Sequence, residues 1–212
     1  AVYGNAGQRG LDNKVVVGVG DAYDELRARL LDDIDDLVVG PGDDEETDVG
    51  PLVTADAQER VLGMIDGAID EGADLVVDGR DFEHPEYPEG NFLGPTLLEG
   101  VTIDMEIART EIFGPVLCLA SVDDLDEAIE MVNGTEYGNA SSLYTERGSE
   151  ARKYRYEVDA GNIGINVGVC APMGFFHFGG RKGSFFGDLH AQGEDAVNFY
   201  TDKTIEIERW YS

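Results

Sequence analysis

Basic side chains are scarce in this sequence of 212 residues, which has 15 lysines and arginines against 44 aspartates and glutamates. The formal net charge at pH 7 is therefore -29. A field of this sign repels the phosphates of nucleic acids and the surfaces of anionic membranes. The composition thus argues against a partner of either class.

The acidic residues are spread along the whole chain, and their densest run is Asp43–Glu46. This pattern is typical of proteins from halophilic archaea. Because the Debye length falls to about 3 Å in molar salt, the self-repulsion of such a chain is largely screened there. We predict that the protein loosens or unfolds in dilute buffer, and a melting temperature that does not change with KCl concentration would contradict this.

Cysteine is also rare, and two residues are too few for a disulfide framework or a four-ligand zinc site. Cys118 lies in the apolar run Pro115–Ala120, where we expect an inert buried thiol. Cys170 lies in a glycine-rich loop and is expected to be partly exposed. The three histidines show no metal-ligand spacing, so the sequence predicts no metal site.

Long apolar runs are missing as well. No run of eighteen apolar residues occurs, and the N-terminus has no basic segment followed by an apolar one, so we expect a cytoplasmic protein. A Gly-x-Gly-x-x-Gly fingerprint after a strand is also absent. Gly18 and Gly20 form a lone pair before a helix, which does not predict a dinucleotide site.

Strand-like apolar runs alternate with helical apolar stripes along most of the chain. This alternation predicts an α/β fold, with a mostly parallel sheet and flanking helices. The predicted strands are Lys14–Val19, Leu75–Asp78, Val116–Val122, Ala140–Tyr144 and Asn162–Val167, and the predicted helix caps are Asp21, Thr54, Asp123 and Ser149.

The segment Thr110–Val116 reads Thr-Glu-Ile-Phe-Gly-Pro-Val. By itself, a Glu and a Phe before Gly-Pro also fit an ordinary entry into a strand. Read with its neighbours, the segment resembles the Glu-Ile-Phe-Gly-Pro motif of the NAD-dependent aldehyde dehydrogenase superfamily. Further segments resemble motifs of that family in the family's order: Asn91–Thr96, Glu136–Ala140, Gly161–Asn166, Phe178–Gly180 and Phe199–Thr204.

Within this superfamily, Gly4–Arg9 is similar to the approach to the nucleophile in the methylmalonate-semialdehyde dehydrogenase branch, whose members form an acyl-CoA. Gly50–Thr54 and Arg152–Tyr154 also fit that branch, although each is a softer match. The resemblance covers nearly the whole chain. It implies the C-terminal half of such an enzyme, without the family's preceding Rossmann-type NAD-binding domain.

The resemblance also implies that the chain is divided into three parts. Residues 1–188 would form the aldehyde dehydrogenase catalytic domain, and residues 189–202 would connect it, through a helix over about Gln192–Tyr200, to the C-terminus. Residues 203–212 would form an oligomerisation strand. Apolar and polar side chains alternate over Lys203–Tyr211, as expected for a strand that pairs with another element or another subunit.

Four residues would match binding residues of the family. Glu111 and Phe113 would hold the ribose and the ring of the nicotinamide of NAD, and Arg9 would bind the carboxylate of the substrate. Phe178 would match a wall of the aldehyde pocket, and a core Phe in a glycine-rich turn is nearly as good an interpretation. Water or CoA would accept the acyl group.

The family's mechanism is covalent, and it begins when a cysteine thiolate attacks the aldehyde. Hydride then leaves to NAD, and the thioester is released to water or to CoA. The cysteine of the family follows Gln-Arg directly, and the residue at that position here is Gly10. Since Cys118 and Cys170 lie in other motifs, we expect that this chain has no nucleophile and does not oxidise aldehydes by itself.

Two functions remain open from the sequence. The first is the catalytic-domain portion of a semialdehyde dehydrogenase that acts on a small aldehyde and forms a homo-oligomer through Lys203–Tyr211. The second is a non-catalytic remnant that binds or assembles with an intact homologue. A truncated product without a function of its own is a third interpretation.

Overall fold

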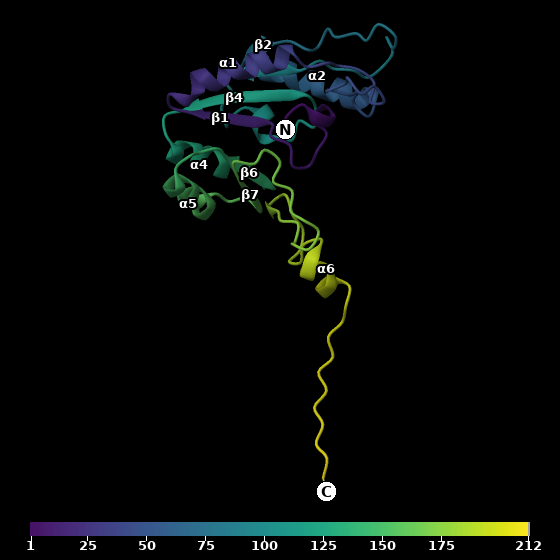
Figure 1. Ribbon diagram of the computed structural model, residues 1–212, viewed down its shortest axis with the longest axis vertical. Coiled ribbons are helices and arrows are strands. Elements are labelled where there is room, and N and C mark those ends of the chain that lie inside the picture. The colour runs from purple at the N-terminus through teal and green to yellow at the C-terminus, as the bar shows by residue number, and fades with distance from the viewer. Residues whose placement is uncertain (212) are drawn as a thin grey trace.

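The computed structural model describes residues 1–211, that is, every residue except Ser212. Its main sheet has the strand order β1 (Val15–Val19), β4 (Val116–Val122), β3 (Thr96–Glu99) and β2 (Asp74–Val77) (Figure 1). The first three strands run parallel, and β2 is antiparallel to β3. The predicted α/β class with a mostly parallel sheet is therefore confirmed.

Three helices belong to this part of the chain: α1 (Ala22–Asp35), α2 (Ala55–Asp70) and the short α3 (Glu106–Arg109). Figure 1 shows α1 and α2 along the same side of β1 and β4. Their apolar stripes and the sheet form the main hydrophobic core, whose fully buried side chains include Val61, Ile65, Leu97, Leu98, Leu117 and Leu119.

A second, smaller core lies beyond β1. It is built from α4 (Leu125–Asn133), β6 (Ala140–Leu143), α5 (Gly148–Glu157) and β7 (Asn162–Ile165), and β6 runs parallel to β7. The predicted parallel strands are thus divided between two sheets, because β6 and β7 form a separate pair that does not bond to β1. The buried side chains of this second core are Ile129, Tyr154 and Val158.

The remaining elements are short. A 3-10 turn, η1 (Gly4–Gly7), precedes β1, and β5 (Tyr137–Gly138) pairs antiparallel with β8 (Arg181–Lys182). The last helix, α6 (Gly193–Phe199), lies within the predicted helix Gln192–Tyr200.

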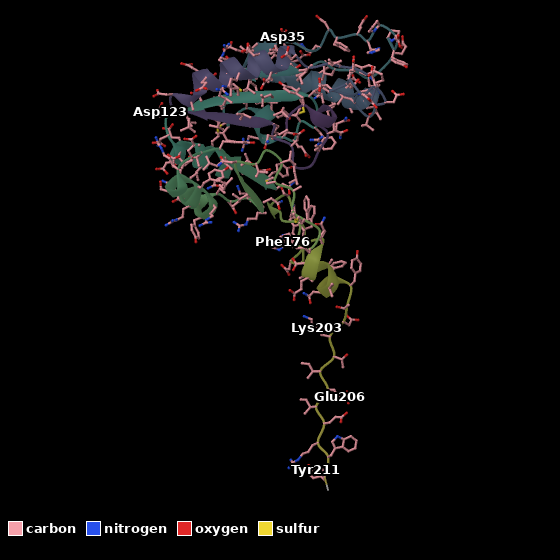
Figure 2. The ribbon with its side chains drawn as sticks, viewed as in Figure 1. Asp35, Asp123, Phe176, Lys203, Glu206 and Tyr211 are labelled. Atoms are coloured by element: carbon pink, nitrogen blue, oxygen red, sulfur yellow. The ribbon has the colours of Figure 1, made fainter. Side chains whose placement is uncertain are left out.

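After α6 the chain extends away from the rest of the molecule (Figures 1 and 2). Residues Lys203–Tyr211 are exposed and form no ladder with any other described residue. The predicted oligomerisation strand, whose last residue Ser212 lies outside the described residues, therefore stays a prediction. The boundary predicted at residue 188 likewise stays a prediction.

One of the predicted helix caps is confirmed. Thr54 has an extended backbone, and its Oγ1 accepts from the N–H three residues ahead at 3.1 Å. The other predictions were wrong. Asp21 already has helical backbone angles and caps nothing, Ser149 lies inside α5, and Asp124 rather than Asp123 caps α4. Asp124 has an extended backbone directly before the first turn of α4, so its carboxylate accepts from two free N–H groups. Asp123 lies one residue earlier and is not the cap.

None of the helices within residues 1–211 is both long enough and apolar enough to cross a membrane. The same residues contain no cluster of three side chains that could hold a metal ion. Cys118 is buried and Cys170 is half-buried, as predicted. Burial raises the pKa of the Cys118 thiol to about 12, although the charge of Lys14 opposes this, so the thiol is not reactive at neutral pH.

Candidate active site

The loop before β1 has an unusual backbone. Asn5, Ala6 and Gly7 are consecutive residues in the left-handed region, with φ values of 56°, 52° and 67°. Gly7 is buried against Gly114, and a Cβ at position 7 would lie only 2.0 Å from the carbonyl oxygen of Gly114. The loop that carries Gly10 is therefore in direct backbone contact with the loop that carries Glu111.

Two side chains hold this loop in place. Gln8 accepts from the N–H of Val53 at 2.9 Å and donates to the carbonyl of Pro51 at 3.2 Å. Tyr3 donates its hydroxyl to the carbonyl of Thr96 on β3 at 3.0 Å. The segment around Pro51, which was only a softer sequence match, thus has a structural role in the loop.

Gly10 is exposed, and the space around it is open. A Cβ built on Gly10 would meet no atom within 4 Å, and φ of Gly10 lies outside the left-handed region. The side-chain amide of Asn139 donates to the Gly10 carbonyl. The backbone therefore does not require glycine here, and a cysteine side chain fits without strain.

The Glu111 turn presents two side chains to solvent around a buried anchor. Ile112 is fully buried, whereas Glu111 is exposed and Phe113 is 38% exposed. Phe113 has φ of 51°, a conformation that costs a bulky residue about 1–3 kcal/mol. Gly114 is packed so tightly on Val61 that a Cβ would lie 2.7 Å from its Cγ2. The buried residues Ile112 and Gly114 thus hold a carboxylate and an aromatic ring on one exposed turn.

The five residues identified from the sequence lie around two cavities that share Glu111. Arg9, Glu111 and Phe113 line a small cavity of about 20 Å³. Gly10, Glu111 and Phe178 line a large cavity of about 1120 Å³. Phe178 is half-buried at the wall of this cavity. All five positions therefore line one or both of two cavities that have Glu111 in common.

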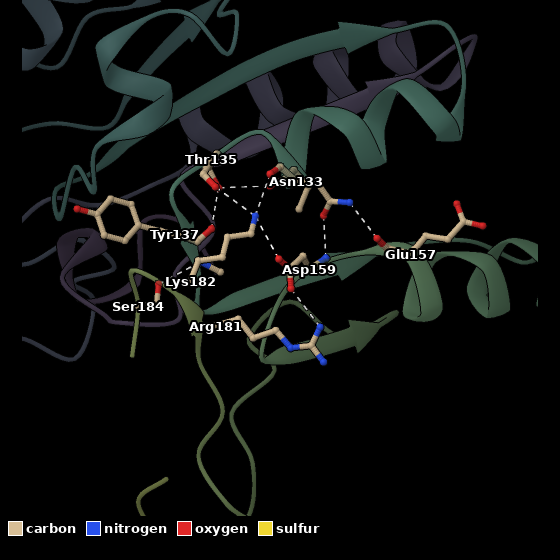
Figure 3. Close-up of polar contacts among 10 residues, drawn as sticks. Asn133, Thr135, Tyr137, Glu157, Asp159, Arg181, Lys182 and Ser184 are labelled. Carbon is tan, nitrogen blue, oxygen red and sulfur yellow. Dashed lines mark hydrogen bonds and ion pairs between the residues drawn. The ribbon is translucent and has the colours of Figure 1, made fainter. Parts of the chain in front are cut away.

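A polar network fixes the strand that follows Phe178 (Figure 3). Lys182 Nζ donates to the carbonyls of Asn133 at 2.9 Å and of Thr135 at 3.2 Å. Arg181 Nη1 lies 3.1 Å from Asp159 Oδ1, and the N–H of Asp159 donates to Asn133 Oδ1 at 2.7 Å. These bonds join β8 to the C-terminal end of α4 and so position the wall of the large cavity.

Two further charged residues belong to the site and were missed by the sequence reasoning. Asp12 and Lys14 line the small cavity with Arg9 and Glu111. Asp12 Oδ2 is buried and has no hydrogen-bond partner within residues 1–211. Lys14 donates to the carbonyl of Thr110 at 2.5 Å, and burial lowers its pKa. The only sequence signal was their place directly after the loop, since no spacing pattern marks them.

Burial raises the pKa of Asp12 from 3.8 to about 6. The folded state therefore binds this proton more tightly than the unfolded chain does. The contribution of Asp12 to stability is present below pH 4 and is lost as the pH rises to about 6. We expect urea unfolding at constant KCl to show that Asp12→Asn gains stability relative to the unmodified protein across this window. The control is Asp35→Asn, on the exposed surface of α1 (Figure 2), and equal pH profiles for both variants would contradict the assignment.

Several known proteins are similar to this chain. A family model described as the aldehyde dehydrogenase family matches residues 1–205. Malonate-semialdehyde dehydrogenase 1 of Geobacillus kaustophilus is 48% identical over 210 residues, which are 99% of this chain and 43% of that protein. The protein of the same name from Oceanobacillus iheyensis is 44% identical over 211 residues, or 100% of this chain and 43% of its own length.

Solved structures agree with the sequence comparisons. Methylmalonate-semialdehyde dehydrogenase from Oceanimonas doudoroffii superposes with a TM-score of 0.97 at 40% identity, over 100% of this chain and 44% of that chain. Mycobacterium tuberculosis aldehyde dehydrogenase complexed with NAD+ superposes with a TM-score of 0.88 at 33% identity, over 100% of this chain and 43% of that chain. The chain thus spans less than half the length of these relatives.

Proposed function

Because this chain belongs to the aldehyde dehydrogenase family, we propose that it supplies the nucleophile loop and the nicotinamide-binding side of an NAD-dependent semialdehyde dehydrogenase. The observation that carries this proposal is the close approach of Gly7 to Gly114, which joins the loop that carries Gly10 to the loop that carries Glu111 and Phe113. The names of the similar proteins from Geobacillus kaustophilus and Oceanimonas doudoroffii support a substrate that carries both an aldehyde and a carboxylate.

The residues present fit one side of a nicotinamide site. When bound, NAD supplies the acceptor for the hydride of the aldehyde. The exposed carboxylate of Glu111 is free to accept two ribose hydroxyls, and the left-handed turn at Phe113 exposes an aromatic side chain two residues further along. The exposed guanidinium of Arg9 is suited to a substrate carboxylate because its planar fork donates two parallel hydrogen bonds. CoA is the proposed acyl acceptor, as in the branch that this chain resembles.

A measurement of NAD binding tests this proposal independently of catalysis. The protein to use is this chain joined to the part of the Geobacillus kaustophilus relative that it does not match, called here the fused protein. We expect Glu111→Gln and Phe113→Ala each to weaken NAD binding to the fused protein about tenfold or more, by calorimetry. Glu146→Gln, at an exposed position elsewhere, is the control. Unchanged affinity in both site variants would refute the assignment.

A second function is supported by the C-terminal segment. Ile205, Ile207 and Trp210 are 88%, 92% and 87% exposed, which is unusual for large apolar side chains. We propose that Lys203–Tyr211 pairs with another subunit, either a second copy or an intact homologue. Light scattering in molar KCl should show a smaller particle after Ile205→Asp, and an unchanged mass would count against this role.

A further inference from the structure

Two side-chain amides join the loop before β1 to the layer of β6 and β7, which Figure 1 shows next to the main sheet. Asn139, between β5 and β6, donates to the carbonyl of Gly10, and Asn13 donates to the carbonyl of Gly168 at 2.7 Å. Within residues 1–211, no other hydrogen bond or ion pair joins the segment that ends with β1 to the chain after α4. Asn139 is therefore the residue of that layer that holds position 10 itself.

Position 10 has few other contacts. Gly10 is exposed, and a Cβ there would meet no atom within 4 Å, so a cysteine side chain would have no neighbour to orient it. The backbone forms a turn in which the N–H of Asp12 donates to the carbonyl of Arg9 at 3.2 Å. This turn defines the shape of the loop but makes no bond to the opposite layer. The location of a thiol at position 10 consequently depends on the backbone that Asn139 holds.

The backbone around Asn139 is itself firmly bonded. The carbonyl of Asn139 accepts from the N–H of Asn162 and from its side-chain Nδ2, at 3.0 Å each. The preceding residue, Gly138, donates its N–H to Ser184 Oγ at 3.1 Å, and its carbonyl accepts from the N–H of Gly161 at 2.9 Å. Asn162 is buried, with 8% of its surface exposed. The amide of Asn139 therefore extends from a fixed base, as a group that positions a site requires.

The same bonds connect Asn139 to the segment of Phe178. Nδ2 of Asn162 also donates to the carbonyl of Gly179, the residue after Phe178, at 3.3 Å. Gly179 is tightly packed, since a Cβ there would lie 2.5 Å from a backbone oxygen. Gly10, Asn139 and Phe178 all line the large cavity. Hydrogen bonds thus run without a break from position 10, through the two asparagines, to the segment that carries the proposed aldehyde wall.

We propose that Asn139 is a positioning residue for the nucleophile of the semialdehyde dehydrogenase site. Its amide holds the backbone of residue 10 at a fixed place relative to Phe178, so that a thiol at position 10 meets an aldehyde that contacts this wall. A displacement of about 1 Å in such a geometry costs on the order of 100-fold in rate. The inference rests on the proposed function, since it assigns a role within the same site, but the hydrogen bond can be tested without NAD or substrate.

NMR relaxation of the full chain in molar KCl provides that test. Asn139→Leu keeps the branch at Cγ and removes the donor. The backbone order parameters of the Gly10 and Leu11 N–H groups should fall from about 0.85 to below about 0.6. Thr145→Val is the matched control, because it removes a 2.6 Å hydrogen bond to Glu150 in the same layer and should leave both order parameters unchanged. Equal order parameters in Asn139→Leu and the unmodified chain would overturn the proposal.

The catalytic consequence is measured in the fused protein in which Gly10→Cys supplies the nucleophile. Asn139→Leu should lower kcat/KM for methylmalonate semialdehyde about 100-fold. NAD affinity, measured by calorimetry, should not change, because Glu111 and Phe113 lie on another segment. Asn139→Gln keeps an amide donor and should recover about tenfold of the lost kcat/KM, and Thr145→Val should lose none.

The outcomes separate this inference from the proposed function. If the fused protein with Gly10→Cys binds NAD and turns over, and Asn139→Leu does not slow it, the positioning role is wrong and the proposed function stands. A parallel loss of NAD affinity in Asn139→Leu would also overturn the inference, because the variant would then disturb the whole site. If the fused protein neither binds NAD nor turns over, the proposed function fails, and the order parameters of Gly10 and Leu11 alone decide whether Asn139 holds position 10.

Discussion

Replacing Gly10 by cysteine in the fused protein is expected to raise NADH formation from methylmalonate semialdehyde by about a millionfold, the loss that removal of a covalent nucleophile causes in a protease. Position 10 can accommodate a cysteine side chain, since a Cβ there meets no atom within 4 Å and the backbone is not left-handed. Arg9, next to it in the sequence, is exposed and available for the substrate carboxylate. One missing sulfur atom therefore accounts for the expected inactivity of the fused protein.

Three controls make the result specific. Gly10→Ala in the fused protein should stay inactive, because it adds a side chain without a nucleophile. Gly10→Cys in this chain alone should also stay inactive, since the chain offers only one side of an NAD site. Labelling with a thiol reagent should detect the cysteine at position 10 but not the buried Cys118. Turnover by Gly10→Ala would contradict this assignment of the nucleophile position. Turnover by Gly10→Cys in the chain alone would contradict the statement that the chain offers only one side of an NAD site.

Local sequence patterns are sufficient to predict individual strands. They do not show which strands lie next to one another in the sheet. The run Val116–Val122 was predicted with the bounds that β4 has, because a long apolar run between turns has few alternatives. The run Lys14–Val19 was equally clear as a strand, yet nothing within it states that one of its two edges is free. Strand order is a tertiary property, which the residue pattern within a single run does not encode.

The residues of the candidate site also divide into those that the sequence predicts and those that it does not. Family motifs led to Arg9, Glu111, Phe113 and Phe178, which the structure places around one pair of cavities. Asp12 has no such motif, and its pKa is raised only because the folded loop buries it. A burial effect of this kind arises from packing between segments about 100 residues apart, so no local pattern could indicate it.

Gly7→Ala is expected to lower the free energy of unfolding by about 3 kcal/mol, measured by urea unfolding at constant KCl. The left-handed φ of 67° accounts for about 1–2 kcal/mol of this loss. The rest is expected from the contact, because a methyl group at position 7 would lie 2.0 Å from the carbonyl oxygen of Gly114, and one of the two loops must move.

Gly10→Ala, three residues along the same loop, is the matched control and should change stability by no more than about 0.5 kcal/mol. The effect of Gly7→Ala on NAD binding distinguishes a contact that positions the site from a contact that only stabilises the fold. If the Gly7 contact positions Glu111 and Phe113, Gly7→Ala in the fused protein should weaken NAD binding under conditions where the fold is still intact by circular dichroism, and Gly10→Ala should not. Equal stability and equal NAD affinity in the two variants would mean that the backbone contact between the loops does not organise the site.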